Sequence, residues 1–303
     1  MATKKPCIGF IGQGWIGRAY ADNFELRGYT TVRYALEKEY KDNKDKIKDC
    51  DIVFIAVWTP TTPEGFDDSI IRSVLPLVGE GKVAVIKSTI LPGTTVEIQK
   101  AFPDSIILYN PEFLSIASHV HDAAHPFANL VGMPVNDAKH LAAAESVMKV
   151  IPHAPFSQIC TSTEAEIFKY SHNASGYMQI LLFNVMYDLS QKLGANWDIV
   201  HKAIQADPLI SNRYSNPIHK TGRGAGGGCF IKDMAALNSH IKKHLPRDAR
   251  THALLDAAEA KNIELLLSTD KDLDLLLGVY GKKIRAENKI ANKIVVVPKN
   301  KKK

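Results

Sequence analysis

The sequence predicts an α/β domain with a parallel sheet at the N-terminus, followed by an all-helical domain. Short runs rich in Val and Ile alternate with amphipathic helical patterns up to Pro152, and mainly helical patterns follow. Strands that alternate with helices pair in parallel, because each helix returns the chain to the starting edge of the sheet. The length of 303 residues suits two ordinary domains. We expect domains at residues 1–155 and 156–267, and a partly disordered tail at 268–303.

The strands expected in the first domain are the apolar runs bounded by turn residues. They are Cys7–Ile11, Thr31–Leu36, Ile52–Val57, Val83–Lys87 and Ile106–Tyr109, with Leu130–Gly132 as a further strand. Helical patterns between several of these runs lie at Ile16–Arg27, Ser69–Val78 and Asp137–Val150. The charged segment between the second strand and Ile52 is short, so we expect an abbreviated crossover there.

The second domain is expected to begin with a long helix. Thr163 and Glu166 have the capping-box spacing, in which a hydroxyl and a carboxylate each satisfy a free amide at a helix start. The helical pattern continues until Gly194, which predicts its end. Further helices are expected at Asp198–Ala206, Asp233–His244 and Ala249–Leu267. Leu265–Leu277 is apolar enough to pack, and the tail holds one short apolar run, Ile294–Val297.

Composition excludes several classes of protein. Hydrophobic residues make up 45% and charged residues 23% of the chain, which is typical of a globular protein. No apolar run approaches the roughly 18 residues that cross a bilayer, and no signal-peptide core follows Met1. We therefore expect a cytoplasmic protein that acts away from membranes. Because the net charge of +6 is modest and lies partly in the terminal lysines, we expect no nucleic-acid partner.

A glycine motif follows the first expected strand. Gly12, Gly14 and Gly17 have the Gly-x-Gly-x-x-Gly spacing at the junction of a strand and a helix. The first glycine permits a tight turn, the second admits a pyrophosphate, and the third allows close contact of helix and strand. The phosphates then lie at a helix N-terminus, where the dipole favours negative charge. A glycine-rich turn is the alternative, but the position at the N-terminus favours a Rossmann dinucleotide site.

Glu37 lies at the end of the second expected strand, about 20 residues beyond the motif, where an acidic residue contacts the adenosine ribose. A carboxylate at this place favours NAD and repels the extra phosphate of NADP. The alternative is a solvated turn residue beside Lys38 and Glu39. We expect NAD as the cofactor.

The stretch Gly222–Asp233 is the most informative part of the second half. Its glycines are costly to order, and they usually mark a backbone that approaches a ligand. Cys229 follows them, and a helix is expected to start at Asp233. A cysteine beside a lysine and near a helix N-terminus has its thiolate form favoured, as a nucleophile requires. A buried cysteine in a flexible loop is the alternative. The other cysteines are Cys7, Cys50 and Cys160; the four lack metal-ligand spacing, so we expect thiols and no metal.

Lys169 and Asn173 lie four residues apart on the expected long helix and therefore share one face. An ammonium and an amide on one face can hold a substrate hydroxyl, a water or a developing oxyanion. A solvated polar stripe is the more ordinary interpretation of such a pair.

Together these features resemble the UDP-glucose/GDP-mannose dehydrogenase family over about residues 6–265. The similar segments follow one another in order along the chain: Cys7–Gly17, Ile55–Thr61, Lys87–Thr95, Asn110–Leu114, Lys169 with Asn173, and Gly222–Asp233. The resemblance implies a soluble enzyme that oxidises a nucleotide-sugar alcohol twice, with NAD, to a carboxylate. UDP-glucose, giving UDP-glucuronate, is the expected substrate.

The resemblance also implies a role for each site residue. Cys229 forms a thiohemiacetal and then a thioester, and Glu112 with Thr89 handles the water that hydrolyses it. Lys169, Asn173 and Asp233 take part in the first hydride transfer. The implied cofactor contacts are Gly12, Gly14, Trp15, Ile16, Gly17, Glu37, Thr59, Pro60, Thr89 and Lys232. The implied substrate contacts are Phe113, Leu114, Lys169, Asn173, Gly226 and Gly227.

The sequence departs from the family pattern in several places. Ile116 and Ala117 stand where the family usually has Glu-Gly, and Ala225 stands where an aromatic residue is common. The family has a third α/β domain, which we expect this chain to lack because only Ser268–Lys303 follows the last expected helix. These departures bear on the identity of the substrate and leave the reaction type intact.

Two other functions remain open from the sequence. A β-hydroxyacid dehydrogenase-like enzyme has a similar length and a related Lys-x-x-x-Asn helix, but a single oxidation needs no nucleophilic cysteine. A non-catalytic NAD-binding member of the family is the second. The resemblance implies a homodimer built around the long helix; its apolar residues could equally form monomer core. They are Tyr177, Ile180, Leu181, Phe183 and Val185.

Overall fold

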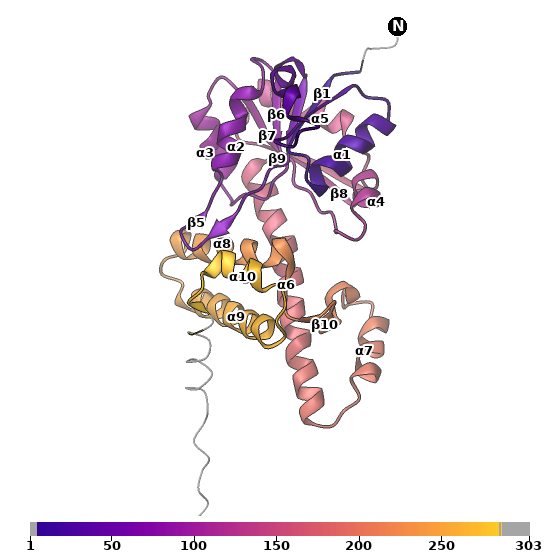
Figure 1. The fold of residues 1–303 in the computed structure, drawn as a ribbon, viewed down its shortest axis with the longest axis vertical. Helices are drawn as coiled ribbons and strands as arrows, with labels where there is room; N and C mark the ends of the chain where they lie inside the picture. Colours follow the sequence, from indigo (N-terminus) through magenta and orange to yellow (C-terminus); the bar gives the residue numbers. More distant parts are fainter. Residues whose placement is uncertain (1–4, 285, 287–303) are drawn as a thin grey trace, which may run out of the picture. The chain divides into compact units, whose positions relative to one another are not determined.

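The computed structural model describes residues 5–284 and 286, which form two compact units. The first unit contains the chain up to Thr59 together with Asp67–Tyr170. The second contains Pro60–Phe66 and the chain from Ser171 onwards. Figure 1 shows the elements of both along the sequence. The division into compact units differs from the boundary expected between residues 155 and 156: it lies between Tyr170 and Ser171, inside one helix, and a short segment near Pro63 joins the second unit.

The first unit is built on a seven-stranded sheet in the order β2-β1-β3-β6-β7-β8-β9. The strands are β1 (Ile8–Ile11), β2 (Thr31–Tyr34), β3 (Ile52–Ile55), β6 (Val83–Ile86), β7 (Ile106–Tyr109), β8 (Ala128–Met133) and β9 (Phe156–Thr161). All neighbouring strands pair in parallel except β7 and β8, which are antiparallel at Tyr109 and Gly132. Every residue of β1, β3, β6 and β7 is buried, as expected for strands covered on both faces. The predicted parallel sheet is confirmed.

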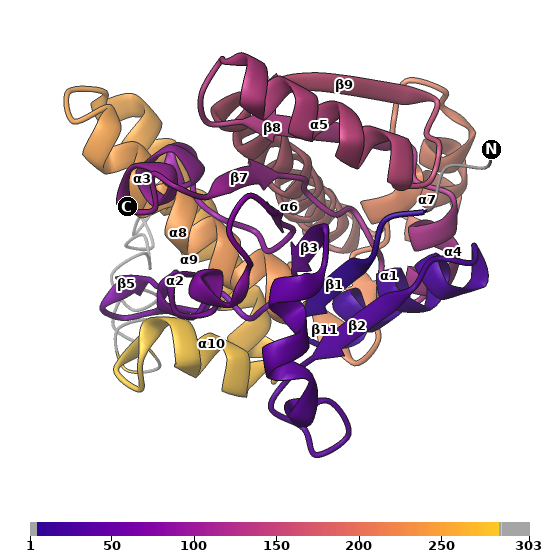
Figure 2. The same ribbon diagram turned by 90° about the horizontal axis from the view of Figure 1, so that it is seen from above.

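Helices cover this sheet on both faces. They are α1 (Trp15–Leu26), α2 (Ser69–Val74), α3 (Thr94–Ala101), α4 (His119–Ala124) and α5 (Ala138–Val150). Figure 2 shows α1 beside α4 and α5 along β8 and β9. The core contains a cluster of Phe10, Phe24 and Phe54, with ring centroids 5.4–5.5 Å apart. The expected abbreviated crossover is confirmed as the 3-10 helix η1 (Lys41–Asp49).

The long helix α6 (Ser162–Lys192) begins two residues earlier than the capping-box prediction requires. Thr161 and Glu164 form the actual box: the Thr161 N–H donates to Glu164 Oε2 at 2.7 Å, and the Glu164 N–H donates to Thr161 Oγ1 at 3.3 Å. The prediction that Thr163 and Glu166 fill this role is wrong. Glu166 instead accepts hydrogen bonds from Gly93 N at 2.6 Å and from Thr95 N at 2.9 Å, at the start of α3.

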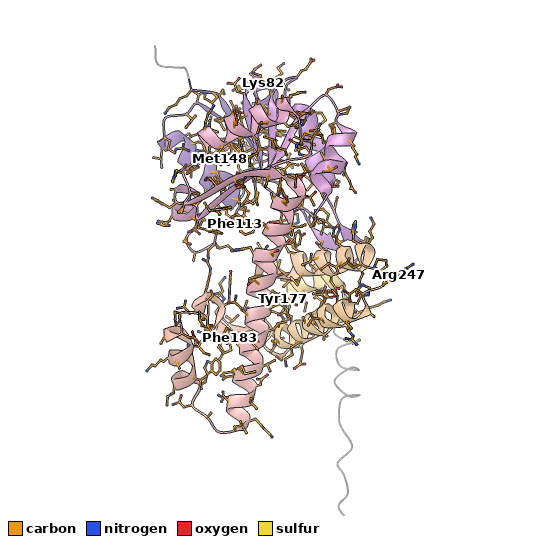
Figure 3. The ribbon with its side chains drawn as sticks, turned by 180° about the vertical axis from the view of Figure 1, so that it is seen from behind. Lys82, Phe113, Met148, Tyr177, Phe183 and Arg247 are labelled. Atoms are coloured by element: carbon orange, nitrogen blue, oxygen red, sulfur yellow. The ribbon has the colours of Figure 1, made fainter. Side chains whose placement is uncertain are left out.

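The second unit combines helices with two short hairpins, so it is not wholly helical. Its elements besides α6 are β4 (Thr61–Thr62), β5 (Gly65–Phe66), α7 (Trp197–Ala206), η3 (Asn212–Tyr214), β10 (Ile218–His219), β11 (Gly222–Arg223), α8 (Gly227–His244), α9 (Ala249–Ser268) and α10 (Leu273–Tyr280). Tyr177 and Phe183 of α6, both labelled in Figure 3, are buried in this unit, and the Tyr177 hydroxyl donates to the Ala258 carbonyl at 3.4 Å.

The segment expected to be a tail contributes to the core of the second unit. Leu276 and Val279 of α10 pack with Ile231, Ile263 and Leu266 in one apolar cluster. The apolar segment Leu265–Leu277, for which the sequence indicated no packing partner, therefore packs in this cluster. A disordered tail from residue 268 is therefore wrong for the part that the structure describes. The apolar run Ile294–Val297 lies outside the described residues. Among the described helices, none is long and apolar enough to span a bilayer.

The environment of Glu166 predicts a change of stability with pH. Burial raises the pKa of Glu166 from its ordinary 4.5 to about 7, while hydrogen bonds from Thr95 and Gly93 oppose the rise. The folded state therefore binds the proton more tightly than the unfolded state does. The stabilisation that the proton on Glu166 gives to the folded state is fully present below pH 4.5 and is lost as the pH rises through 7.

As the pH rises from 4.5 to 7, we expect the free energy of unfolding of the wild type to fall by about 1–3 kcal/mol relative to that of Glu166→Gln. The glutamine has no proton to lose in this range. Urea titrations across this range measure the difference. Glu145→Gln, an exposed change on α5, is the control and should parallel the wild type. A constant difference between Glu166→Gln and the wild type at all pH values would contradict the prediction.

Candidate active site

The Gly12–Gly17 turn joins β1 to α1 in the first unit. A Cβ at Gly12 would lie 2.3 Å from the Ala56 carbonyl oxygen, and one at Gly17 would lie 2.0 Å from the Gly12 carbonyl oxygen. A Cβ at Gly14 would meet no atom within 4 Å, so the backbone there is open to a ligand. Gly14 also precedes α1 without a side-chain cap, which leaves amides at the helix start available for a pyrophosphate. The turn fits a dinucleotide.

Of the remaining cofactor contacts expected from the sequence, Thr59, Thr89 and Glu37 lie beyond the ends of strands. Thr59, after β3, donates from Oγ1 to the Thr89 carbonyl at 2.9 Å, so these two residues meet beyond the carboxyl ends of β3 and β6. Ligands of such sheets bind at this edge. Trp15 and Ile16 begin α1, and the Trp15 ring contacts His119 edge-on. Glu37 is exposed beyond β2, and Pro60 belongs to the second unit.

Glu112 and Lys169 form a buried ion pair in the first unit. Lys169 Nζ donates to the Glu112 carbonyl oxygen at 2.6 Å and lies 3.1 Å from Oε1, and each residue is only 3% exposed. The Leu114 N–H donates to the other carboxylate oxygen at 2.8 Å. Phe113 packs between the rings of Phe127 and Phe168. The Glu112 carboxylate is thus fixed in position with its charge balanced.

Lys87 is a charged residue of this region to which sequence reasoning gave no role. Its ammonium donates to Asn110 Oδ1 at 2.7 Å and lies 4.0 Å from the centre of the Tyr20 ring. Burial lowers the pKa of Lys87 to about 7; the charge of Glu112 opposes the change and that of Lys169 adds to it. The sequence signal that could have indicated this residue is a lysine directly after a buried central strand. It ties the end of β6 to the Asn110–Leu114 segment.

Asp233 is the centre of a second buried group, which belongs to the second unit. Asn173 Nδ2 donates to Asp233 Oδ2 at 2.7 Å, and Lys232 Nζ lies 2.5 Å from Oδ1. Asp233 is 1% exposed. Asn173 thus contacts Asp233, whereas Lys169, expected to share a helix face with Asn173, contacts Glu112 in the first unit.

Cys229 is the third residue of α8, which begins at Gly227. The prediction that this helix starts at Asp233 is wrong: the helix begins at Gly227, whose φ of 79° lies in the left-handed region that favours glycine. Cys229 and Asp233 are four residues apart and therefore lie on one face of α8. Gly226, expected to contact substrate, lies against Asp272, whereas a Cβ at Gly227 would meet nothing within 4 Å. A half-buried thiol at a helix N-terminus is suited to nucleophilic attack.

Two family models match the chain. Residues 29–151 match the NAD binding domain of the UDP-glucose/GDP-mannose dehydrogenase family, and residues 163–264 match its central domain. The Bacillus subtilis protein YtcA, by its provisional name a UDP-glucose 6-dehydrogenase, is 31% identical over 258 residues, which are 80% of this chain and 55% of YtcA. The chain spans about half the length of the curated relatives it matches.

Solved structures share the fold. A UDP-glucose dehydrogenase from Pyrobaculum islandicum superposes with a TM-score of 0.73 at 23% identity, over 88% of this chain and 72% of that one. The Mycobacterium tuberculosis 3-hydroxyisobutyrate dehydrogenase superposes with a TM-score of 0.63 at 15% identity, over 93% and 99% of the two chains. At sequence identities of 23% and 15%, these structural similarities establish the fold alone.

The contrast between Gly14 and Gly17 predicts separable effects on binding and folding. Gly14→Ala adds a methyl group where no protein atom lies within 4 Å, in a backbone conformation open to alanine. We expect unchanged thermal stability and a Kd for NAD that rises about tenfold or more, because the methyl group obstructs the pyrophosphate.

Gly17→Ala instead forces a clash inside the protein and should lower stability by about 1–3 kcal/mol. Calorimetric titration with NAD and thermal unfolding of both variants measure the two effects. Unchanged NAD affinity in Gly14→Ala would contradict the assignment of this turn.

Proposed function

Because the chain belongs to the UDP-glucose/GDP-mannose dehydrogenase family, we propose that it oxidises a nucleotide-sugar alcohol to a carboxylate in two NAD-dependent steps. UDP-glucose is the substrate and UDP-glucuronate the product. The observation that carries the proposal lies in α8, where Cys229 precedes by one turn the Asp233 carboxylate that Asn173 and Lys232 hold. A nucleophile and a fixed acid–base group on one helix face suit a covalent oxidation.

The first oxidation requires that the alcohol lose its proton as the hydride leaves. Lys169 and Asn173, one turn apart on α6, supply an ammonium and an amide that stabilise the developing alkoxide. Asp233 accepts the proton directly or through a water. NAD held by the Gly12–Gly17 turn would supply the hydride acceptor, and we assign Lys232 as a further cofactor contact.

The second oxidation begins when the Cys229 thiolate adds to the aldehyde carbon. The sulfur–carbon bond forms, and the carbonyl oxygen takes a proton to give a thiohemiacetal. Loss of that proton and of a hydride, for which a second NAD would be the acceptor, gives the thioester. An aldehyde has no readily lost hydride until a nucleophile has added, which is why this step needs the cysteine.

Hydrolysis completes the cycle. Water adds to the acyl carbon, the carbon–sulfur bond breaks, and the thiolate leaves as the carboxylate forms. We assign the activation or positioning of this water to Glu112, with Thr89 as its helper. The fixed carboxylate of Glu112 supports this assignment, because Lys169 and the Leu114 amide hold both of its oxygens in place.

A single-step oxidation is the second candidate. The 3-hydroxyisobutyrate dehydrogenase fold covers nearly the whole of this chain and of its own, so length and architecture are compatible with it. A single oxidation gives no function to Cys229. A family member that binds NAD without turnover is the third candidate, and it gives no function to the buried Asp233 group.

The proposal extends to a homodimer. Among the apolar residues of α6 that could form an interface, Tyr177, Leu181 and Phe183 are buried inside the unit. Val185 is exposed, so it is available for contact with a second copy. An exposed apolar stripe follows α6 at helical spacing and continues to Leu193 just beyond its end; within the helix it contains Met178, Leu182, Val185, Met186 and Leu189. Such a stripe favours association with a second copy. A molar mass of one chain by light scattering would exclude the dimer.

The covalent mechanism predicts two NADH for each molecule of acid. UDP-glucose, UDP-N-acetylmannosamine, UDP-galactose and GDP-mannose should be tested with NAD, by absorbance and by product analysis. With the substrate so identified, Cys229→Ala and Cys229→Ser should lose acid formation by about a thousandfold or more while their Kd for NAD stays within about twofold.

The outcomes separate the candidates. One NADH per substrate would favour the single oxidation, and NAD binding without turnover on any substrate would favour the third candidate. Acid formation by Cys229→Ala at near the wild-type rate would exclude the thioester.

A further inference from the structure

The turn Thr269–Asp272 between α9 and α10 contacts the glycine-rich segment that precedes Cys229. Thr269 Oγ1 accepts a hydrogen bond from the Arg223 N–H at 3.1 Å. Lys271 Nζ donates to the Gly224 carbonyl at 2.8 Å, and Asp272 Oδ2 accepts from the Gly227 N–H at 2.8 Å. The turn follows the residues that match the family's central domain, which end at residue 264.

Asp272 supplies the cap that α8 lacks in its own sequence. The residue before the helix is Gly226, which has no side chain to accept a hydrogen bond. The carboxylate of Asp272 takes this place at the first amide of the helix. It therefore lies at the same helix end as Cys229, where the helix dipole and nearby charges act on a thiolate.

The turn lies so close to the segment that a Cβ at either of two glycines would force side chains of the turn to move. A Cβ at Gly226 would lie 2.0 Å from Asp272 Oδ2, and one at Gly222 would lie 2.5 Å from Thr269 Oγ1. Contact with the turn therefore accounts for the absence of a side chain at these two positions.

Lys271 is held in the same contact. It is 6% exposed, and burial lowers the pKa of Lys271 while the charge of Asp272 opposes the change. A buried ammonium needs an acceptor, and the Gly224 carbonyl provides one. The lysine thus fixes the backbone three residues ahead of the helix.

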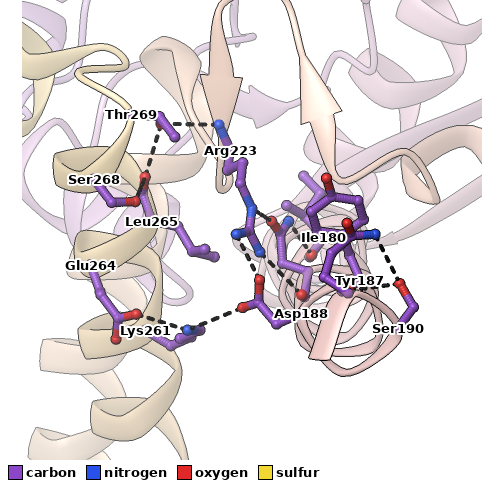
Figure 4. A network of polar contacts seen from close by, with 12 residues as sticks. Ile180, Tyr187, Asp188, Ser190, Arg223, Lys261, Glu264, Leu265, Ser268 and Thr269 are labelled. Carbon is purple, nitrogen blue, oxygen red and sulfur yellow. Dashed lines mark hydrogen bonds and ion pairs between the residues drawn. The ribbon is translucent and has the colours of Figure 1, made fainter. Parts of the chain in front are cut away.

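The other side of the segment is fixed by Arg223. Figure 4 shows its backbone bonded to Thr269 and its guanidinium extending to α6. The guanidinium donates to Asn184 Oδ1 at 2.8 Å and lies 2.7 Å from Asp188 Oδ1. The segment is held between α6 and the turn.

The turn itself keeps a conformation that needs such support. Asp270 and Asp272 have φ angles of 51° and 52°, in the left-handed region that few residues other than glycine adopt. Conformations of this kind persist where surrounding contacts hold them. Asp272 has these contacts, whereas Asp270 is exposed and has no hydrogen bond or ion pair within the described part of the chain.

We propose that Lys271 and Asp272 are positioning residues for Cys229, which fix the backbone leading into α8 and place a negative charge at the helix end that carries the thiol. The inference rests on the proposed function for its catalytic meaning. Its effect on the thiol is independent of any substrate, because the contacts lie within the second unit.

The test compares Asp272→Asn, Asp272→Ala and Asp270→Ala in the full chain. Alkylation of Cys229 by iodoacetamide at pH 7 is followed by mass spectrometry of its peptide, with Cys160 as the reference thiol. Asp272→Asn keeps an oxygen acceptor but loses the charge, so we expect Cys229 to react about two- to fivefold faster. Its rate of acid formation should stay within about threefold of the wild type.

Asp272→Ala loses both charge and acceptor. We expect faster alkylation of Cys229 together with a kcat that falls about tenfold or more at little-changed KM, because the displaced thiol no longer meets its substrate correctly. Asp270→Ala alters the same turn and the same backbone conformation, and should match the wild type in both measurements.

Two outcomes overturn the proposal: equal alkylation rates of Cys229 in all four proteins, or a kcat of Asp272→Ala equal to that of Asp270→Ala. Failure of the proposed function is a different result, in which Cys229→Ser still forms acid. The alkylation comparison remains decisive for the turn in that case.

Discussion

Lys169 and Glu112 place opposite charges 3.1 Å apart inside the first unit, and each depends on the other to remain there. Removing one partner of a buried pair leaves an uncompensated charge and typically costs about 3–5 kcal/mol. The pair also accounts for the fixed geometry of the Asn110–Leu114 segment, because Lys169 binds both the carbonyl and the carboxylate of Glu112. A group meant to position water is thereby part of the folded core.

In the second unit, too, buried charged side chains need polar partners. Asp233 is almost fully buried, and Asn173 with Lys232 satisfies its two oxygens. Asp272 and Lys271 find their partners in the backbone instead, because they form hydrogen bonds with an amide and a carbonyl of the segment ahead of Cys229. Charged side chains in this protein thus position backbone and reactive groups, and a family-level motif describes only part of that arrangement.

The parts of the fold that the sequence predicted are those with strong local signals. Buried runs of Val and Ile specify β1, β3, β6 and β7, and the glycine spacing specifies the turn before α1. Strand β9 was missed because its residues are largely exposed or half-buried at the sheet edge and show no apolar alternation. The start of α8 at Gly227 was missed because the side chain that accepts a hydrogen bond from its first amide is Asp272, which lies 45 residues further along the chain.

The site was predicted less completely for a related reason. Motifs identified Cys229, Glu112 and Asp233 together with Lys169, Asn173 and Lys232, but not which of these side chains pair. They also missed the Thr269–Asp272 turn, which only the folded chain brings near the segment ahead of Cys229. Glu166 was assigned to a helix cap, although its carboxylate binds amides of Gly93 and Thr95 more than 70 residues away. Lys87 stood in a recognised segment without a role, since its contact with Asn110 joins two neighbouring strands.

The central claim is that an acyl group forms on Cys229 and that Glu112 serves its hydrolysis. The most direct measurement is the mass of the Cys229 peptide after acid quench of Glu112→Gln incubated with nucleotide sugar and NAD. The mechanism predicts an acyl adduct of the sugar on this peptide, which hydroxylamine removes. No adduct on Cys229, from a variant that still produces NADH, would contradict the mechanism.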